Sequence, residues 1–64
     1  MMVKLEDILT LLHGDEIVAV RCRGRELFRG EAVECKAEKY TDSHIKEMNY
    51  NAIIKGYIIY IMHE

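Results

Sequence analysis

The feature that most constrains this chain is a strongly apolar segment near its C-terminal end, residues 57–62, which read Tyr-Ile-Ile-Tyr-Ile-Met. Successive side chains of a β-strand point to opposite faces of a sheet, so two apolar sets predict burial on both faces. The chain has 64 residues, and a chain of this size buries only about 60% of the surface that its unfolded form exposes. It has at most a couple of helices to cover such a strand. The pattern therefore predicts that a partner subunit or partner protein covers one side.

Composition and charge favour one small globular domain, residues 1–64. Half of the residues are hydrophobic and none is proline, which is unlike a disordered or linker-like chain. The formal net charge of −2 predicts no broad attraction to nucleic acid or to an anionic membrane. Two cysteines are too few for a secreted disulfide framework, and charged residues interrupt the N-terminal apolar residues. We therefore expect a cytoplasmic protein with reduced thiols, no signal peptide and no membrane-spanning segment.

The first half of the chain predicts a helix followed by a β-hairpin. Apolar residues recur over residues 5–12 at the i, i+3, i+4, i+7 spacing of an amphipathic helix, and Gly14 supplies its stop. Residues 17–20 are rich in β-branched side chains and predict a strand that is at least half buried. A two-residue loop at Arg23 and Gly24 would close a hairpin. In that register Cys22 faces Arg25, Arg21 faces Glu26, Val20 faces Leu27 and Ala19 faces Phe28.

The second half predicts a short helix and a second hairpin. Residues 31–40 have an acidic start and a basic end, which match the helix dipole, while residues 41–47 form either a turn cluster or one further helical turn. An apolar period of two from Met48 indicates a strand, and Lys55 with Gly56 is short enough for a hairpin loop. That loop would place Ile54 opposite Tyr57, Ala52 opposite Ile59, Tyr50 opposite Ile61 and Met48 opposite His63.

These elements define the expected fold class, which is α+β. We expect a small four-stranded antiparallel sheet, made of the two hairpins, with an N-terminal helix and a short second helix on one face. The apolar side chains that these elements turn toward one another predict the hydrophobic core. Its expected members are Leu5, Ile8, Leu9, Leu12, Val18, Val20, Phe28, Tyr50, Ala52, Ile54, Ile59 and Ile61.

The other face of the second hairpin is mixed rather than fully polar, and it is the expected oligomer interface. The predicted register places Ile53 opposite Ile58, with asparagines opposite Tyr60 and Met62. Apolar side chains on a face that the helices do not cover favour self-association. We therefore expect a homodimer or a higher homo-oligomer with an interface formed by Ile53, Ile58, Tyr60 and Met62.

Four of the nine basic residues are arginines that crowd the first hairpin. Guanidinium groups offer paired, planar donors that suit phosphate or carboxylate. Such a cluster fits a nucleotide phosphate, a nucleic-acid backbone or an acidic protein surface, and it equally fits an edge hairpin that is kept soluble by charge. The ligand or partner residues predicted on this basis are Arg21, Arg23, Arg25 and Arg29.

No spacing in the sequence indicates a metal site, a cofactor site or a catalytic centre. The histidines and cysteines lack CxxC and HxxxH spacing, and Cys22 and Cys35 lie on different expected elements. A cysteine nucleophile would need a base in reach, and no signature surrounds either thiol. We therefore expect a protein without metal, cofactor or enzymatic activity.

Three segments carry a resemblance to a group of known proteins: residues 4–9 (KLEDIL), 25–30 (RELFRG) and 56–61 (GYIIYI). They resemble small uncharacterised proteins encoded by phages, prophages and other mobile elements of Gram-positive bacteria. Those proteins combine a leading helix, a charged hairpin and a terminal apolar strand, and they have no motif whose residues transfer as functional. The resemblance implies an accessory role by binding, such as blocking a host defence component or sequestering a signalling nucleotide.

The expected function is that of a non-catalytic, self-associating binding protein in the cytoplasm of a bacterial host. Its expected partner, besides further copies of itself, is a host protein or an anionic small ligand. Two alternatives stand beside it. One is a nucleic-acid or nucleotide binder that uses the arginine hairpin, and the other is a purely structural oligomerisation unit without a ligand.

Overall fold

The computed structural model describes residues 3–62, which fold into two hairpins and two short helices. Helix α1 (Leu5–Leu11) leads into strands β1 (Ile17–Cys22) and β2 (Arg25–Glu31). Helix α2 (Ala32–Cys35) follows, and strands β3 (His44–Asn51) and β4 (Gly56–Met62) form the second hairpin. The prediction of an α+β fold with four strands and two helices is confirmed for this part of the chain.

The strand order of the sheet is β2-β1-β4-β3, and the two central strands run parallel. Each hairpin is antiparallel internally, but β1 pairs with β4 in the same direction, so the prediction of a purely antiparallel sheet is wrong. Parallel neighbours need a long crossover connection, and here β2, α2 and β3 together provide it. The arrangement places β4, the most apolar strand, in the interior of the sheet, where both of its edges are paired.

The first hairpin has the predicted two-residue loop. Arg23 and Gly24 have positive φ angles of 53° and 79°, as a tight hairpin turn of the primed type requires. The predicted pairs Cys22 with Arg25 and Arg21 with Glu26 are confirmed. The pairs predicted further along are wrong, because a bulge at this point shifts the register by one residue. Beyond the bulge, Val20 pairs with Phe28 and Ala19 pairs with Arg29.

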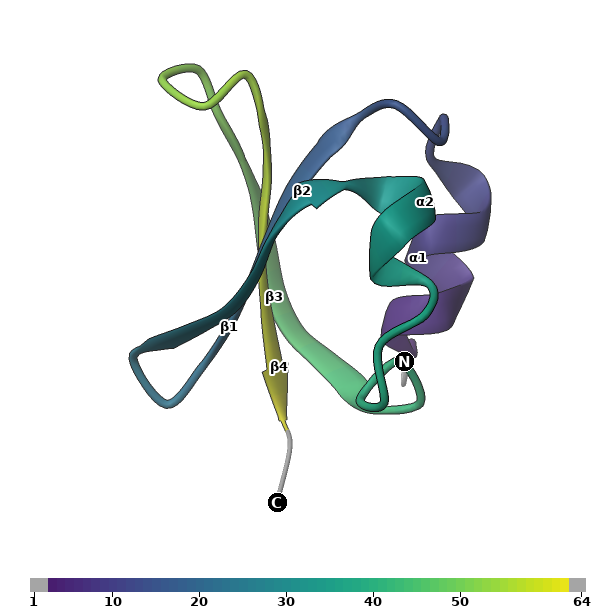
Figure 1. Ribbon diagram of the computed structural model, residues 1–64. Helices are drawn as coiled ribbons and strands as arrows, with labels where there is room; N and C mark the ends of the chain where they lie inside the picture. Colours follow the sequence, from purple (N-terminus) through teal and green to yellow (C-terminus); the bar gives the residue numbers. More distant parts are fainter. Residues whose placement is uncertain (1–2, 63–64) are drawn as a thin grey trace.

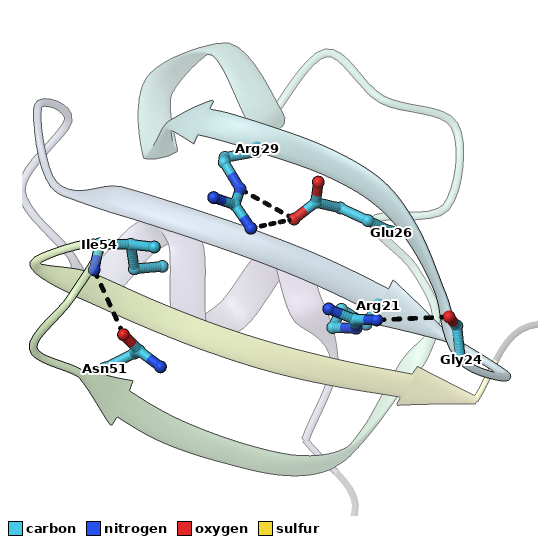
Figure 2. Close-up of polar contacts among 6 residues, drawn as sticks. All are labelled: Arg21, Gly24, Glu26, Arg29, Asn51 and Ile54. Atoms are coloured by element: carbon cyan, nitrogen blue, oxygen red, sulfur yellow. Dashed lines mark hydrogen bonds and ion pairs between the residues drawn. The ribbon is translucent and has the colours of Figure 1, made fainter.

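The second hairpin has a longer turn than predicted, which spans residues 52–55. The Asn51 side-chain oxygen accepts hydrogen bonds from the amides of Ile53 (2.9 Å) and Ile54 (3.2 Å), and this Asx-type arrangement closes the turn. Figure 2 shows the bond from Ile54. Every pair predicted from a Lys55-Gly56 loop is therefore displaced, and His63, the predicted partner of Met48, lies outside the described residues. The observed pairs include Tyr50 with Tyr57, Asn49 with Ile58 and Met48 with Ile59.

The segment between α2 and β3 is mostly turns, so the helix predicted for residues 31–40 is too long. The amides of Leu5 and Glu6, at the start of α1, donate to the carbonyl oxygens of Ser43 (2.9 Å) and Thr41 (2.8 Å). The first N–H groups of a helix have no partner within the helix. The turn segment satisfies two of them and at the same time holds α1 against the beginning of β3.

The hydrophobic core lies between one face of the sheet and the two helices, which both lie on that face (Figure 1). Of the predicted core, Tyr50 and Ala52 are exposed, because the second hairpin has the longer turn and a different register. Ile45 and Met48 pack against the core from β3 in their place. Six predicted core residues are confirmed as buried, namely Leu5, Leu9, Val18, Val20, Ile59 and Ile61, and Cys22, Ala32 and Cys35 join them.

Gly56 pairs directly with Ile17 at the beginning of the parallel ladder between β1 and β4. A Cβ atom on Gly56 would collide with the backbone carbonyl of Ile17. We expect Gly56→Ala to lower the free energy of unfolding by about 1–3 kcal/mol, the usual cost of overpacking. Urea denaturation followed by circular dichroism measures this change.

The neighbouring Lys55 supplies a matched control. Its φ of 55° lies in the left-handed region, which glycine adopts readily, so Lys55→Gly should keep stability within about 1 kcal/mol of the parent. A Gly56→Ala variant that is as stable as the parent would contradict the close approach of β1 and β4.

Candidate functional site

One face of the sheet carries no helix, and this is the first candidate binding surface. Val18, Val20 and Ile59 point into the core, so the alternate residues of β1 and β4 point to the other side. That side has Ala19 beside Ile58 in the parallel ladder. We call it the open face and define it by Ile17, Ala19 and Arg21 of β1 and Ile58, Tyr60 and Met62 of β4.

Three of the four predicted interface residues lie together on this face. Ile58 and Tyr60 are half-buried in its middle, and Met62, which is 58% exposed, ends the row. Ile53 lies elsewhere, in the turn of residues 52–55, where it is 91% exposed. It is separated from Met62 by the full length of β4, so the four residues do not form one patch. Whether any of them contacts a partner stays a prediction.

The four arginines of the first hairpin do not form one cluster, because their side chains have different surroundings. Figure 2 shows that Arg29 bonds through Nε and Nη2 to one Glu26 oxygen, both at 2.8 Å, so its charge is matched locally. Arg25 is exposed and pairs with Cys22, whose side chain faces the core. Arg21 lies on the open face, where its Nη2 donates to the carbonyl oxygen of Gly24 (3.3 Å). Only Arg21 and Arg23 border a concave surface.

That concave surface is an open depression of about 820 Å³ at the end of the sheet where β1 and β4 finish. Three chain segments form it: the tip of the first hairpin, the last residues of β4, and the segment that enters β3. We call it the strand-end depression. Its lining residues are Arg21, Cys22, Arg23, Gly24, Asp42, Ser43, His44, Lys46, Tyr60, Ile61 and Met62.

The residues that the other hairpin and its entering segment bring to the depression were not predicted as neighbours of the arginines, and His44, Lys46 and Tyr60 are among them. Lys46 belongs to residues 41–47, whose structure the sequence pattern left undecided. Strand β3 begins at His44, and a register shift falls between Ile45 and Glu47, at Lys46. The sequence before Met48 could have indicated an earlier start of β3 through alternating polar and apolar residues. The register shift at Lys46 interrupts that alternation, so the pattern is weak.

The cysteines and histidines do not assemble into a site. Within residues 3–62 no group of three His, Cys, Asp or Glu side chains could hold a metal ion, and both cysteines are buried and form no disulfide. Burial, with a smaller effect from the Glu38 charge, raises the pKa of the Cys35 thiol to about 11. Burial also raises the pKa of Tyr40, aided by the nearby Cys35 and Glu38. A thiol that keeps its proton at neutral pH is a poor nucleophile.

Comparison with known proteins gives no family for this chain. Neither the models of protein families, nor the curated proteins, nor the solved structures match it. Among the helices that the structure describes, none has the length and apolar character to cross a membrane. The open face and the strand-end depression are therefore the structural basis for a functional proposal.

Burial of Cys35 and Tyr40 predicts that the protein loses stability at alkaline pH. An unperturbed thiol titrates near 8.5, whereas the folded thiol holds its proton until about pH 11. The unfolded chain therefore loses this proton first, which favours unfolding as the pH rises from about 8.5 toward 11. We expect a loss of roughly 3 kcal/mol across this window, since one pKa unit corresponds to about 1.4 kcal/mol.

Urea unfolding at a series of pH values from neutral to alkaline measures this loss. Cys35→Ala should be less stable than the parent at neutral pH and should show a flatter decline at alkaline pH. A urea midpoint of the parent protein that stays constant from about pH 8.5 to 11 would show that ionisation of the buried thiol does not affect the free energy of unfolding.

Proposed function

We propose that the protein is a non-catalytic binding protein that self-associates, and that the open face is its interface with a second copy. The observation that carries this proposal is that both helices cover the same face of the sheet. The opposite face has half-buried Ile17 and Ile58 at its centre beside the fully buried Ala19, with Tyr60 next to them. The strands on either side add charged residues at its edges, such as Arg29 opposite Ala19 and Glu47 opposite Tyr60. Apolar sheet surfaces of this kind are normally covered.

The dimensions of the molecule agree with a weak, self-complementary dimer. Its two longest extents are 27 and 22 Å. A face of that size would bury roughly 600 Å² on each copy and about 1,200 Å² in total, at the lower end for specific interfaces. A two-fold axis would bring the same patch of both copies together, which is the commonest symmetry of soluble dimers. Association at micromolar concentration is therefore the expected strength.

The resemblance to small mobile-element proteins supports a more specific form of this proposal. In that form the protein acts in the cytoplasm of a bacterial host, as an accessory factor that binds a host protein or a small anionic ligand. Blocking a defence component and sequestering a signalling nucleotide are the two activities that fit. A purely structural oligomerisation unit would have the open face but no use for the strand-end depression.

A second candidate function, binding of a nucleotide or nucleic acid, is favoured by one observation of its own. Arg21 and Arg23 lie at the rim of the strand-end depression together with Lys46, which comes from the other hairpin. Positive side chains that converge on a concavity create a local field that attracts phosphates even when the net charge is −2. The two candidate functions share Arg21, Tyr60 and Met62, so a ligand that contacts these residues would compete with the second copy for that end of the open face.

Self-association is tested by the substitution Ile58→Lys. In the monomer the new ammonium group faces water, whereas in the dimer it would lose its hydration at the centre of the interface without a partner. We expect the parent to be at least a dimer at micromolar concentration by light scattering, and Ile58→Lys to be monomeric there. A comparable loss is expected for Tyr60→Asp.

The matched control is Leu11→Lys, which replaces an exposed apolar residue of α1 by the same charge on the helical side. It should leave the dimer intact. A monomeric parent across the micromolar range would overturn the proposal. Equal dissociation of the dimer by Leu11→Lys and Ile58→Lys would place the interface elsewhere.

A further inference from the structure

The strand-end depression lies where the two parallel strands of the sheet end. Strands β1 and β4 are adjacent and parallel from Ile17 with Gly56 to Arg21 with Tyr60. Their carboxyl ends therefore meet at one edge, beside the depression. In open sheets with parallel strands, ligands are commonly bound just outside the carboxyl ends of those strands. The topology thus forms a concave site that neither hairpin would form alone.

The charged residues that line the depression are three cations and one carboxylate, and they come from both hairpins and the segment that enters β3. Glu26 lies beside Arg21 and Glu47 beside Tyr60 in the sheet. Arg21 and Arg23 project from the first hairpin and Lys46 from the second, while Asp42 supplies the carboxylate of the lining. The hydrogen bond from Arg21 Nη2 to the Gly24 carbonyl holds the guanidinium at the hairpin tip. A guanidinium has five N–H donors, so this contact leaves most of them for a ligand.

An aromatic ring lies next to these charges. Tyr60 is half-buried and is the direct partner of Arg21 across the parallel ladder. Aromatic side chains stack on nucleobases with little dependence on which base is present. The depression therefore combines positive charges for phosphates, of which Arg21 is held by the Gly24 carbonyl, with a ring for a base.

We infer that the strand-end depression binds the phosphate groups of a small nucleotide, with its base against Tyr60. The volume of about 820 Å³ lies within the range of small-molecule sites, about 300–1,000 Å³. Three permanent cations match a di- or triphosphate. A duplex interface typically uses roughly six to ten phosphate contacts, more than this cluster provides. Of the phosphate-bearing ligands, a single nucleotide is thus favoured over duplex nucleic acid.

This inference rests on the proposed function in that it takes the protein to be a binding protein, but the site lies within one chain. Its failure can therefore be distinguished from a failure of self-association. A monomer that binds nucleotide would reject the dimer alone. Because the dimer would cover Tyr60, nucleotide is titrated into the monomeric Ile58→Lys variant as well, and a failure of both the dimer and this monomer to bind it would reject this site alone.

The experiment is isothermal titration calorimetry of the full chain at low salt with adenosine triphosphate as the probe. We expect saturable binding that weakens as salt is added. The double variant Arg23→Gln/Lys46→Gln should weaken the affinity by more than about tenfold, because charge-assisted hydrogen bonds to phosphate are lost. Arg29→Gln removes the same type of charge from the same hairpin outside the depression, and it should bind within about twofold of the parent.

Further probes separate the parts of the ligand. Inorganic triphosphate should bind more weakly than adenosine triphosphate, and Tyr60→Leu should remove that difference. Absence of binding by both the parent and the monomeric Ile58→Lys variant, or an equal loss of affinity in Arg29→Gln, would overturn the inference. Equal affinity for inorganic triphosphate would overturn the role of Tyr60 and the nucleotide assignment. Tighter binding of a short oligothymidylate than of the nucleotide would assign the depression to single-stranded nucleic acid instead. Thermal unfolding of each variant checks that the fold is retained.

Discussion

The parallel pairing of β1 with β4 is the interaction on which the rest of this structure depends. It joins two hairpins that are otherwise separate, and Gly56 permits it because a side chain there would meet the backbone of Ile17. The same pairing sets Arg21 beside Tyr60 and brings the tip of the first hairpin close to the start of β3. Both candidate binding surfaces therefore result from a single ladder of hydrogen bonds.

Both helices lie on one face of the sheet because hydrogen bonds with the connecting loops hold them there. The turn segment before β3 accepts hydrogen bonds from the first amides of α1, and the first residues of α2 donate to the loop after α1 through Ala32 to Glu16 (2.8 Å) and Val33 to Gly14 (3.0 Å). These contacts hold both helices on the same side. Residues 3–62 contain no further helix for the other side, which is why a second copy is the proposed cover.

The two candidate surfaces were predicted from the sequence to different degrees. The apolar residues Ile58, Tyr60 and Met62 follow from strand alternation, which is a local property, and the structure places them on one face. The arginines of the first hairpin were recognised as one cluster, but the structure gives them different surroundings. Some contact a residue nearby in the sequence, and others lie beside residues of the second hairpin. Arg29 bonds to Glu26, whereas Arg23 faces a depression completed by Lys46. No spacing rule connects residue 23 with residue 46, because their proximity follows from strand order.

The sequence by itself determined the local elements: an amphipathic first helix, a tight turn at Arg23 and Gly24, strands where β-branched and aromatic residues cluster, and six of the buried core residues. These features depend on periodicity and on backbone preferences within a few residues. The tertiary structure alone decided the parallel order of the central strands, the bulge beyond Arg21, the longer turn after Asn51 and the location of Lys46. Each of these depends on which surfaces pack together and on which backbone groups find partners far along the chain, and no local pattern records that choice.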